Sequence, residues 1–133
     1  MIIDTMVFVY ALLGVREFRD QAVNVLASAE SIQVPDSFRA ELVNVVWQWI
    51  QYQNVPLETG LEVLQDANSL IDQAISSDLL WERALKLAVE NFHTAYDTLF
   101  IAAAENMKTR LITFDKKLLE IFPEWTLDAN KFQ

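Results

Sequence analysis

The sequence predicts a small three-layer α/β domain, in which a short parallel sheet is flanked by helices on both faces. The candidate strands are short apolar runs without alternating polar positions, which is typical of strands buried on both faces. Longer segments with apolar residues at helical spacing separate these runs. Strands that alternate with helices build parallel sheets, and the right-handed connections between them place helices on both faces.

The elements follow in chain order. Candidate strands cover residues 1–3, 31–34, 110–115 and 125–127. Candidate helices run from Asp4 to about residue 13, over 16–29, 37–53, 56–75, 78–91 and 94–105, and up to residue 122. Pro35 closes the second strand, Asp36 or Ser37 can cap the next helix, and Pro56 stands at a favoured first-turn position.

Composition indicates a folded chain of one domain, residues 1–133. Hydrophobic residues make up 53% and charged residues 22% of the chain, which excludes a disordered protein. No apolar run approaches the roughly 20 residues that span a bilayer, and the first residues do not resemble a signal peptide. Without cysteine, the chain has neither disulfides nor thiolate metal sites. We therefore expect a soluble cytoplasmic protein.

The net charge of −9 argues against a surface that binds nucleic acid through its own basic residues. It does not exclude an enzyme that acts on nucleic acid through bound cations, because such ions supply positive charge locally. An acidic surface also suits a basic segment of a protein partner.

Four acidic residues are expected to gather at one edge of the sheet. Asp4 and Asp115 each directly follow a buried strand, and open α/β sheets bind ligands at the carboxyl ends of their strands. Glu41 lies one turn into the helix after the second strand. Asp97 begins the helix that leads to the strand at 110–115, so it can face the same edge.

Each acid also has a purely structural interpretation. Asp4 and Asp115 stand where a helix begins and can cap it, and Thr94 with Asp97 fits the Thr-x-x-acid capping pattern. Glu41 can be an ordinary surface glutamate paired with an arginine. Four carboxylates in one place, by contrast, repel one another unless cations neutralise them. Oxygen ligands without His or Cys select Mg²⁺ or Mn²⁺, which can activate water against a phosphodiester.

Four segments carry a family resemblance. They read IIDTMVFVYALLG, VPDSFRAELVNVVW, RALKLAVENFHTAYDTLFIAAAE and RLITFDKKL, and they cover essentially the whole chain. Together they resemble PIN domains, and most closely the VapC-type toxins of bacterial and archaeal toxin–antitoxin pairs. The chain departs from the family at Met6, where an Asn or Ser is usual, so a polar group beside the metal is missing.

The resemblance implies a metal-dependent ribonuclease that cuts single-stranded or structured RNA. Asp4, Asp97 and Asp115 would bind Mg²⁺ or Mn²⁺, with Glu41 as a further ligand or as the base that orients water. The Thr113 hydroxyl would line the site. The implied partners are RNA and a cognate antitoxin, and we expect a homodimer without membrane association. The rival interpretation is a catalytically silent PIN-like domain that binds RNA or a protein, which Met6 and the negative charge favour.

Three further features have open interpretations. His93, the only histidine, could approach the substrate, but we expect it to be a solvated residue at a helix boundary. Trp47 either packs under the helix that begins at Pro56 or belongs to a subunit or antitoxin interface, where tryptophan is a favoured anchor. The lysines and arginine at positions 108, 110, 116 and 117 are expected near the acids, where they can hold RNA phosphates or simply remain solvated.

Overall fold

A five-stranded parallel sheet runs through the centre of the computed structural model, which describes residues 1–133. Its strands, in chain order, are β1 (Ile2–Ile3), β2 (Gln33–Pro35), β3 (Gln73–Ile75), β4 (Leu111–Thr113) and β5 (Thr126–Asp128). They lie side by side in the order β3-β2-β1-β4-β5. The chain moves outward from β1 to β3 and then returns to β4 and β5. The change of direction therefore falls between β1 and β4.

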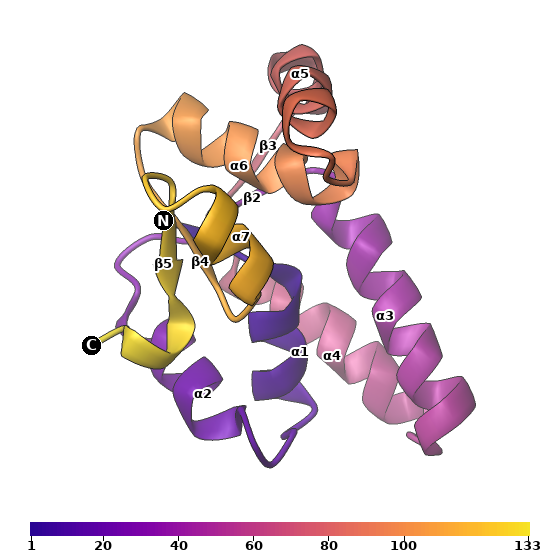
Figure 1. Ribbon diagram of the computed structural model, residues 1–133. Helices are drawn as coiled ribbons and strands as arrows, with labels where there is room; N and C mark the ends of the chain where they lie inside the picture. The colour runs from indigo at the N-terminus through magenta and orange to yellow at the C-terminus, as the bar shows by residue number, and fades with distance from the viewer.

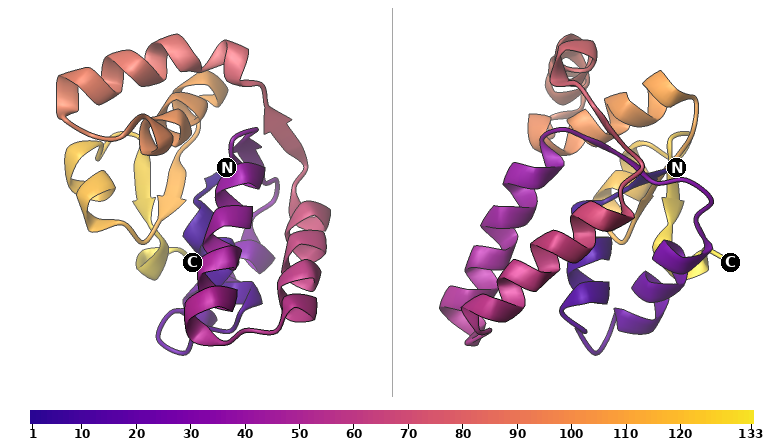
Figure 2. Two further views of the ribbon diagram at one scale, coloured as in Figure 1. Left: turned by 90° about the vertical axis from the view of Figure 1, so that its right-hand side faces the viewer. Right: turned by 180° about the vertical axis from the view of Figure 1, so that it is seen from behind.

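Helices cover both faces of this sheet, as the sequence predicts (Figure 1). They are α1 (Thr5–Leu12), α2 (Arg19–Ser28), α3 (Phe38–Gln53), α4 (Leu57–Leu70), α5 (Trp81–Asn91), α6 (Ala95–Met107) and α7 (Lys116–Ile121), with the 3₁₀ turns η1 (Ser77–Leu79) and η2 (Ala129–Lys131). The left view of Figure 2 shows α1 to α4 on one side of the strands and α5 to α7 on the other. No helix is long and apolar enough to cross a bilayer.

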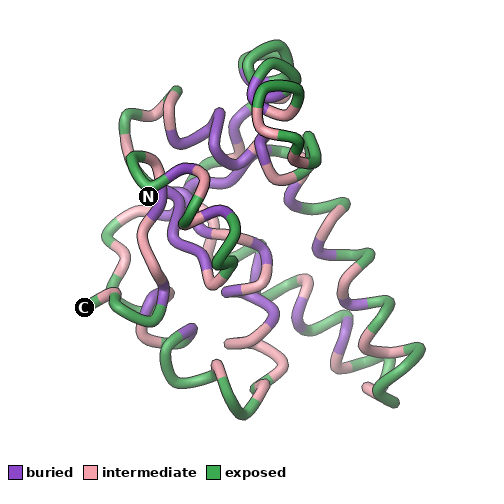
Figure 3. Tube along the Cα trace, viewed as in Figure 1, coloured by how far each residue is buried: buried purple, intermediate pink, exposed green.

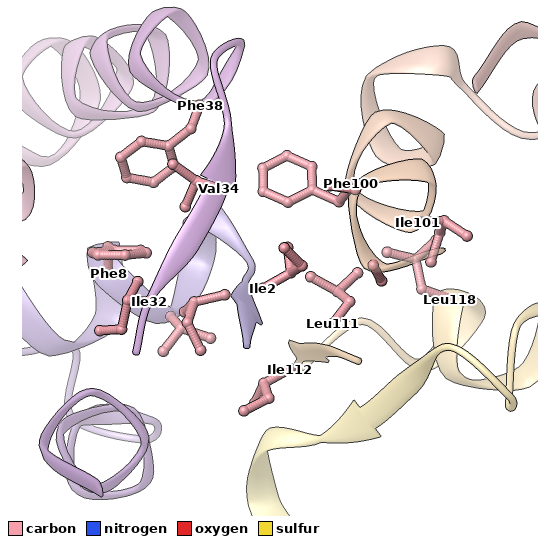
Figure 4. Close-up of a cluster of buried hydrophobic side chains, with 14 of the residues drawn as sticks. Ile2, Phe8, Ile32, Val34, Phe38, Phe100, Ile101, Leu111, Ile112 and Leu118 are labelled. Atoms are coloured by element: carbon pink, nitrogen blue, oxygen red, sulfur yellow. The ribbon is translucent and has the colours of Figure 1, made fainter. Parts of the chain in front are cut away.

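The core follows the sheet. Ile2 and Ile3 of β1 and Leu111 and Ile112 of β4 are completely buried, which explains why these strands show no polar alternation. Figure 3 shows that burial concentrates along the strands and the inner faces of the helices. In Figure 4 the α6 and α7 side chains approach the strands from one side, and those of α1 and α3 approach from the other.

The third strand is the main departure from the predicted elements. The sequence pattern extends one helix over residues 56–75, whereas α4 ends at Leu70 and β3 pairs in parallel with β2. Asp72 N and Gln73 N both turn to the carbonyl of Ile32, at 2.8 and 3.4 Å. The spacing of Ile71 and Ile75 also fits a helical stripe, and β3 lies at the sheet edge with Gln73 exposed, so this strand lacks the apolar run expected of the others.

Other boundaries differ by a few residues. The second strand includes Pro35 rather than ending before it, and α2 begins at Arg19 after a turn. Ser37 stands at the start of α3 but its hydroxyl makes no capping hydrogen bond. Asp36 does not cap that helix either, because its carboxylate accepts from Ser77 N at 3.1 Å.

Helices α3 and α4 form a hairpin whose close approach depends on Gly60. A Cβ added at Gly60 would lie 2.7 Å from Ile50 Cδ1 and 2.9 Å from Val46 Cγ1. Both distances are shorter than carbon atoms tolerate, and Val46 is buried. The glycine is therefore required by packing and not by backbone conformation.

We expect Gly60→Ala to lower the free energy of unfolding by about 1–3 kcal/mol, the usual cost of overpacking. This is the opposite of what helix propensity alone predicts, since alanine favours a helix by about 1 kcal/mol over glycine. Thermal or urea unfolding measures the change. In an Ile50→Val background, which lacks one of the two clashing methyl groups, Gly60→Ala should cost less than it does in the wild type. An equal cost in both backgrounds would show that this methyl group is not the cause.

Candidate active site

The four predicted acids come together. Asp4, Glu41, Asp97 and Asp115 all line one cavity of about 600 Å³. Asp4 follows β1 and Asp115 follows β4 closely, so the cavity lies at the carboxyl ends of the two strands between which the chain changes direction. This is where open α/β sheets bind their ligands.

Thr113 links two of these acids. Its buried hydroxyl donates to Asp4 Oδ2 at 2.5 Å and accepts from Asp115 N at 3.0 Å. Asp4 Oδ1 also accepts from Thr5 N at 2.8 Å, at the start of α1. Hydrogen bonds from the start of α1 and from the end of β4 thus hold the Asp4 carboxylate in place.

The capping interpretation is confirmed for two acids without separating them from the cavity. Asp4 caps α1, and Asp115 Oδ1 caps α7 by accepting from Lys117 N and Leu118 N at 2.8 and 3.2 Å. Capping and lining the cavity are therefore compatible roles.

Asp97 behaves differently from a cap. Thr94 caps α6 by accepting from Asp97 N at 3.5 Å, whereas the Asp97 carboxylate points to a side chain. His93 Nε2 lies 2.8 Å from Asp97 Oδ2. The His93 side chain is only 10% exposed, so the expectation of a solvated histidine is wrong. The chain leaves α5 at Phe92 in the left-handed conformation (φ 52°), and the His93 ring that follows contacts the Asp97 carboxylate instead of water.

Glu41 is also not an ordinary surface residue. Its Oε2 is buried without a hydrogen-bond partner, and no arginine pairs with it. Desolvation by burial, and then the charges of Asp4 and Asp97, raise the pKa of Glu41 to about 7. The Thr5 hydroxyl lies close enough to Glu41 to oppose this rise in pKa. It does not form a hydrogen bond, however, because Thr5 Oγ1 and Glu41 Oε2 are both without a partner.

The pKa of Asp4 is raised in the same way as that of Glu41. Burial raises its pKa to about 6, the hydrogen bond from Thr113 opposes this, and the charges of Asp97 and Asp115 add to the rise. An acceptor without a donor, and two carboxyl groups whose pKa values are raised by burial and by the charges of neighbouring acids, suit a hard cation. As they stand, no three His, Asp or Glu side chains form a group that could hold a metal ion. To bind a metal ion together, the carboxylates would have to turn inward from their present contacts with Thr113, His93 and the backbone.

The basic residues divide between the two ends of the sheet. Lys116 and Lys117 line the cavity, as expected. Lys108 and Arg110 precede β4 and so stand at its opposite end, where the expectation of a place near the acids is wrong. A strand separates the two pairs.

Sequence reasoning missed the remaining lining residues, apart from Met6. These are Tyr10, Phe18, Phe114 and Asn130. Phe114 could have been found, because it stands between Thr113 and Asp115. Phe18 lies in the turn before α2 and Asn130 lies in η2, and neither position has a periodic pattern that signals it.

A parallel sheet of this order with an acid-lined cavity at its central carboxyl edge defines the class of the protein as a PIN domain. The PIN domain family model matches residues 1–122, and the chain belongs to this family. This confirms the resemblance seen in the sequence.

The individual relatives are VapC and toxin–antitoxin proteins. Ribonuclease VapC3 of Pyrobaculum aerophilum is 27% identical over 128 residues, covering 85% of this chain and 88% of the relative. A toxin–antitoxin complex from Klebsiella pneumoniae contains a similar chain, with a TM-score of 0.68, 20% identity and 96% of each chain covered. VapBC2 from Rickettsia felis, bound to a DNA fragment from their promoter, gives a TM-score of 0.65 and 17% identity, covering 96% of this chain and 98% of the other. The structural similarities confirm the predicted fold.

We expect the metal-free protein to become less stable as the pH rises. Folding raises the pKa of Asp4 from 3.8 to about 6 and that of Glu41 from 4.5 to about 7. Such a carboxyl binds its proton more tightly in the folded state. Its contribution to stability is therefore complete below the ordinary pKa and is lost as the pH rises through the folded-state pKa. For Asp4 the difference corresponds to roughly 3 kcal/mol.

Melting temperatures in a chelating buffer between about pH 4 and pH 8 measure this loss. Asp4→Asn and Glu41→Gln should flatten the fall and melt above the wild type at the alkaline end. Asp78→Asn removes an exposed acid outside the cavity and should follow the wild-type curve. If melting temperature falls with pH in the same way in all four proteins, folding does not raise the pKa values of Asp4 and Glu41.

Proposed function

We propose that this PIN domain is a VapC-type toxin, an Mg²⁺- or Mn²⁺-dependent ribonuclease that a cognate antitoxin inhibits in the cytoplasm. The convergence of four carboxylates on one cavity, with Glu41 Oε2 left without a partner, carries the proposal. The names of the relatives support it, since one is a ribonuclease and two are toxin–antitoxin complexes.

Each side chain then has a distinct role. Asp4, Asp97 and Asp115 are proposed to hold the metal, and Thr113 and His93 orient two of these carboxylates through their contacts. Bound divalent ions supply activation of water and stabilisation of the leaving oxygen of a phosphodiester. Glu41 acts as a further ligand or orients the attacking water. Lys116 and Lys117 stand at the same cavity and hold phosphates of the RNA.

The catalytically silent alternative depends on Met6 and on the charge. Met6 does line the cavity, and a thioether is a poor ligand for a hard cation. All four carboxylates are nevertheless present beside it. We therefore favour the enzyme, with metal affinity as the property that Met6 affects.

We expect Asp97→Asn to abolish most RNA cleavage while preserving the fold. An amide is a poor ligand for a hard cation, and even residues behind metal ligands cost about 10–100-fold, so we expect a loss of at least about 100-fold. The capping bond remains, because it uses the backbone N of residue 97. Cleavage of RNA by the purified protein, free of antitoxin, is the measurement, and Asp78→Asn serves as the control. Full cleavage by Asp97→Asn together with a strong drop in melting temperature would favour a structural role.

A divalent ion that binds only the folded protein must stabilise it. At about 100 times the dissociation constant the gain is roughly 2.7 kcal/mol, which corresponds to a melting shift of several degrees. Calorimetry should show this shift with Mn²⁺ and Mg²⁺, and much less with a monovalent salt of matched ionic strength. The shift should shrink in Asp4→Asn, Asp97→Asn and Asp115→Asn. A wild type without any metal-specific shift would exclude the metal site.

We propose a homodimer that uses the exposed apolar surface of α3. Trp47 is 48% exposed and contacts Tyr52 edge-on, with 5.9 Å between the ring centroids. The idea that Trp47 packs under α4 is therefore wrong. Val46 and Ile50 occupy that position beside Gly60.

Trp47→Glu should convert the dimer into folded monomers, because it places a charge in the interface at a side chain that is exposed in the single chain. Light scattering distinguishes the two states. Leu85→Glu is the matched variant, since it lies on a second exposed apolar surface on α5. Monomers formed only by Leu85→Glu would move the interface from α3 to α5.

A further inference from the structure

Three aromatic rings stand together at one side of the acid-lined cavity. Tyr10 of α1 stacks on Phe18 of the turn before α2, with centroids 4.3 Å apart and planes inclined by 16°. Phe114, which follows β4, meets Tyr10 and Phe18 edge-on at 5.4 and 5.3 Å. We call these three rings the aromatic wall.

The aromatic wall lies at the edge of the core, with Tyr10 and Phe114 packed against it and Phe18 outside it. All three residues are only half-buried, and all three line the cavity that contains the acids. The pair Phe8 and Phe38, with centroids 4.7 Å apart, provides the contrast, because both of its rings are completely buried. Rings that only served packing would gain more from burial of that kind.

The cavity offers three kinds of surface in one place. It has carboxylates proposed to cut a phosphodiester, the ammonium groups of Lys116 and Lys117, and aromatic rings. Its volume of about 600 Å³ lies within the range of roughly 300–1,000 Å³ that small ligands occupy. A nucleotide matches this combination, since its phosphate is anionic and its base has a flat apolar face.

We propose that the aromatic wall binds an unpaired base of the RNA substrate and thereby positions the neighbouring phosphate at the acids. The proposal rests on the ribonuclease function proposed above. Within a duplex, bases stack on one another and cannot insert between side chains, whereas unpaired bases stack on aromatic rings. The wall therefore selects single strands, loops or bulges. Stacking tolerates every base, so it adds affinity without requiring a particular sequence.

The alternative role of the wall is to hold the turn between α1 and α2. Phe18→Leu separates the two roles, because leucine keeps an apolar side chain of similar size but has no ring face. A packing role predicts little change in RNA binding once the protein is folded. A stacking role predicts weaker binding of RNA that carries bases and unchanged binding of RNA that does not.

The experiment uses the full chain with Asp97→Asn, so that the RNA stays intact in buffer containing Mg²⁺. Fluorescence anisotropy compares a labelled single-stranded octamer of mixed sequence with an octamer of the same backbone that lacks its bases. One stacked base contributes a factor of about 5–150 in affinity. We expect Phe18→Leu to weaken binding of the normal octamer at least about fivefold and to leave the abasic octamer unaffected. Phe92→Leu makes the same change at an exposed aromatic residue outside this cavity and should bind both octamers as the parent does.

Equal binding of the two octamers by the parent protein would overturn the proposal, and the aromatic wall would then be a contact surface for a side chain of a protein partner. Unchanged binding by a stable Phe18→Leu would overturn it as well. If Phe18→Leu melts below the assay temperature, Phe114→Leu takes its place, and the comparison of octamers needs no substitution in the wall. The failure of the wider function is separate: wild-type protein without metal-dependent cleavage overturns the enzyme, while base-dependent binding would still support the subsite.

Discussion

The structure depends on holding four like charges around one cavity, two of them on carboxyl groups that are partly removed from water. Asp4, Glu41, Asp97 and Asp115 face one cavity, and burial together with mutual repulsion raises the pKa of Asp4 and Glu41. Such an arrangement costs stability, so the rest of the chain must hold it in place. Two central strands with completely buried side chains provide that support, and Asp4 N is itself bonded to the carbonyl of Ile112 at 3.0 Å.

The support and the site use the same groups. Asp115 satisfies the first amides of α7 with Oδ1, and Asp4 shares its two oxygens between Thr5 N and Thr113 Oγ1. A carboxylate has room for several partners on its two oxygens. The hydrogen bonds from the first amides of α1 and α7 hold the carboxylates of Asp4 and Asp115 in place. Their remaining lone pairs are available to the cavity that both residues line.

Much of this could be predicted from the sequence because buried strands and the residues that follow them are tied together. Short apolar runs reveal β1 and β4, and the acids directly after them must lie at one sheet edge. The sequence could not reveal β3, since a polar edge strand with Ile71 and Ile75 at helical spacing imitates a helix. Phe18 and His93 were also beyond prediction of this kind. Both lie where the chain turns, and only the three-dimensional path of the backbone decides where their rings point.

The hydrogen bond between Thr113 and Asp4 has a consequence for the synthesis and folding of the protein. These two residues are 109 positions apart in the chain, and β1 and β4 are neighbours in the sheet. Chains are made from the N-terminus, and contacts between distant segments form late because closing a long loop costs entropy. A nascent chain therefore holds Asp4 and Glu41 long before the strand that completes their surroundings has been made, and Asp97 shortly before it. The acid-lined cavity is complete only when nearly all of the chain has been synthesised, so partly made chains lack it.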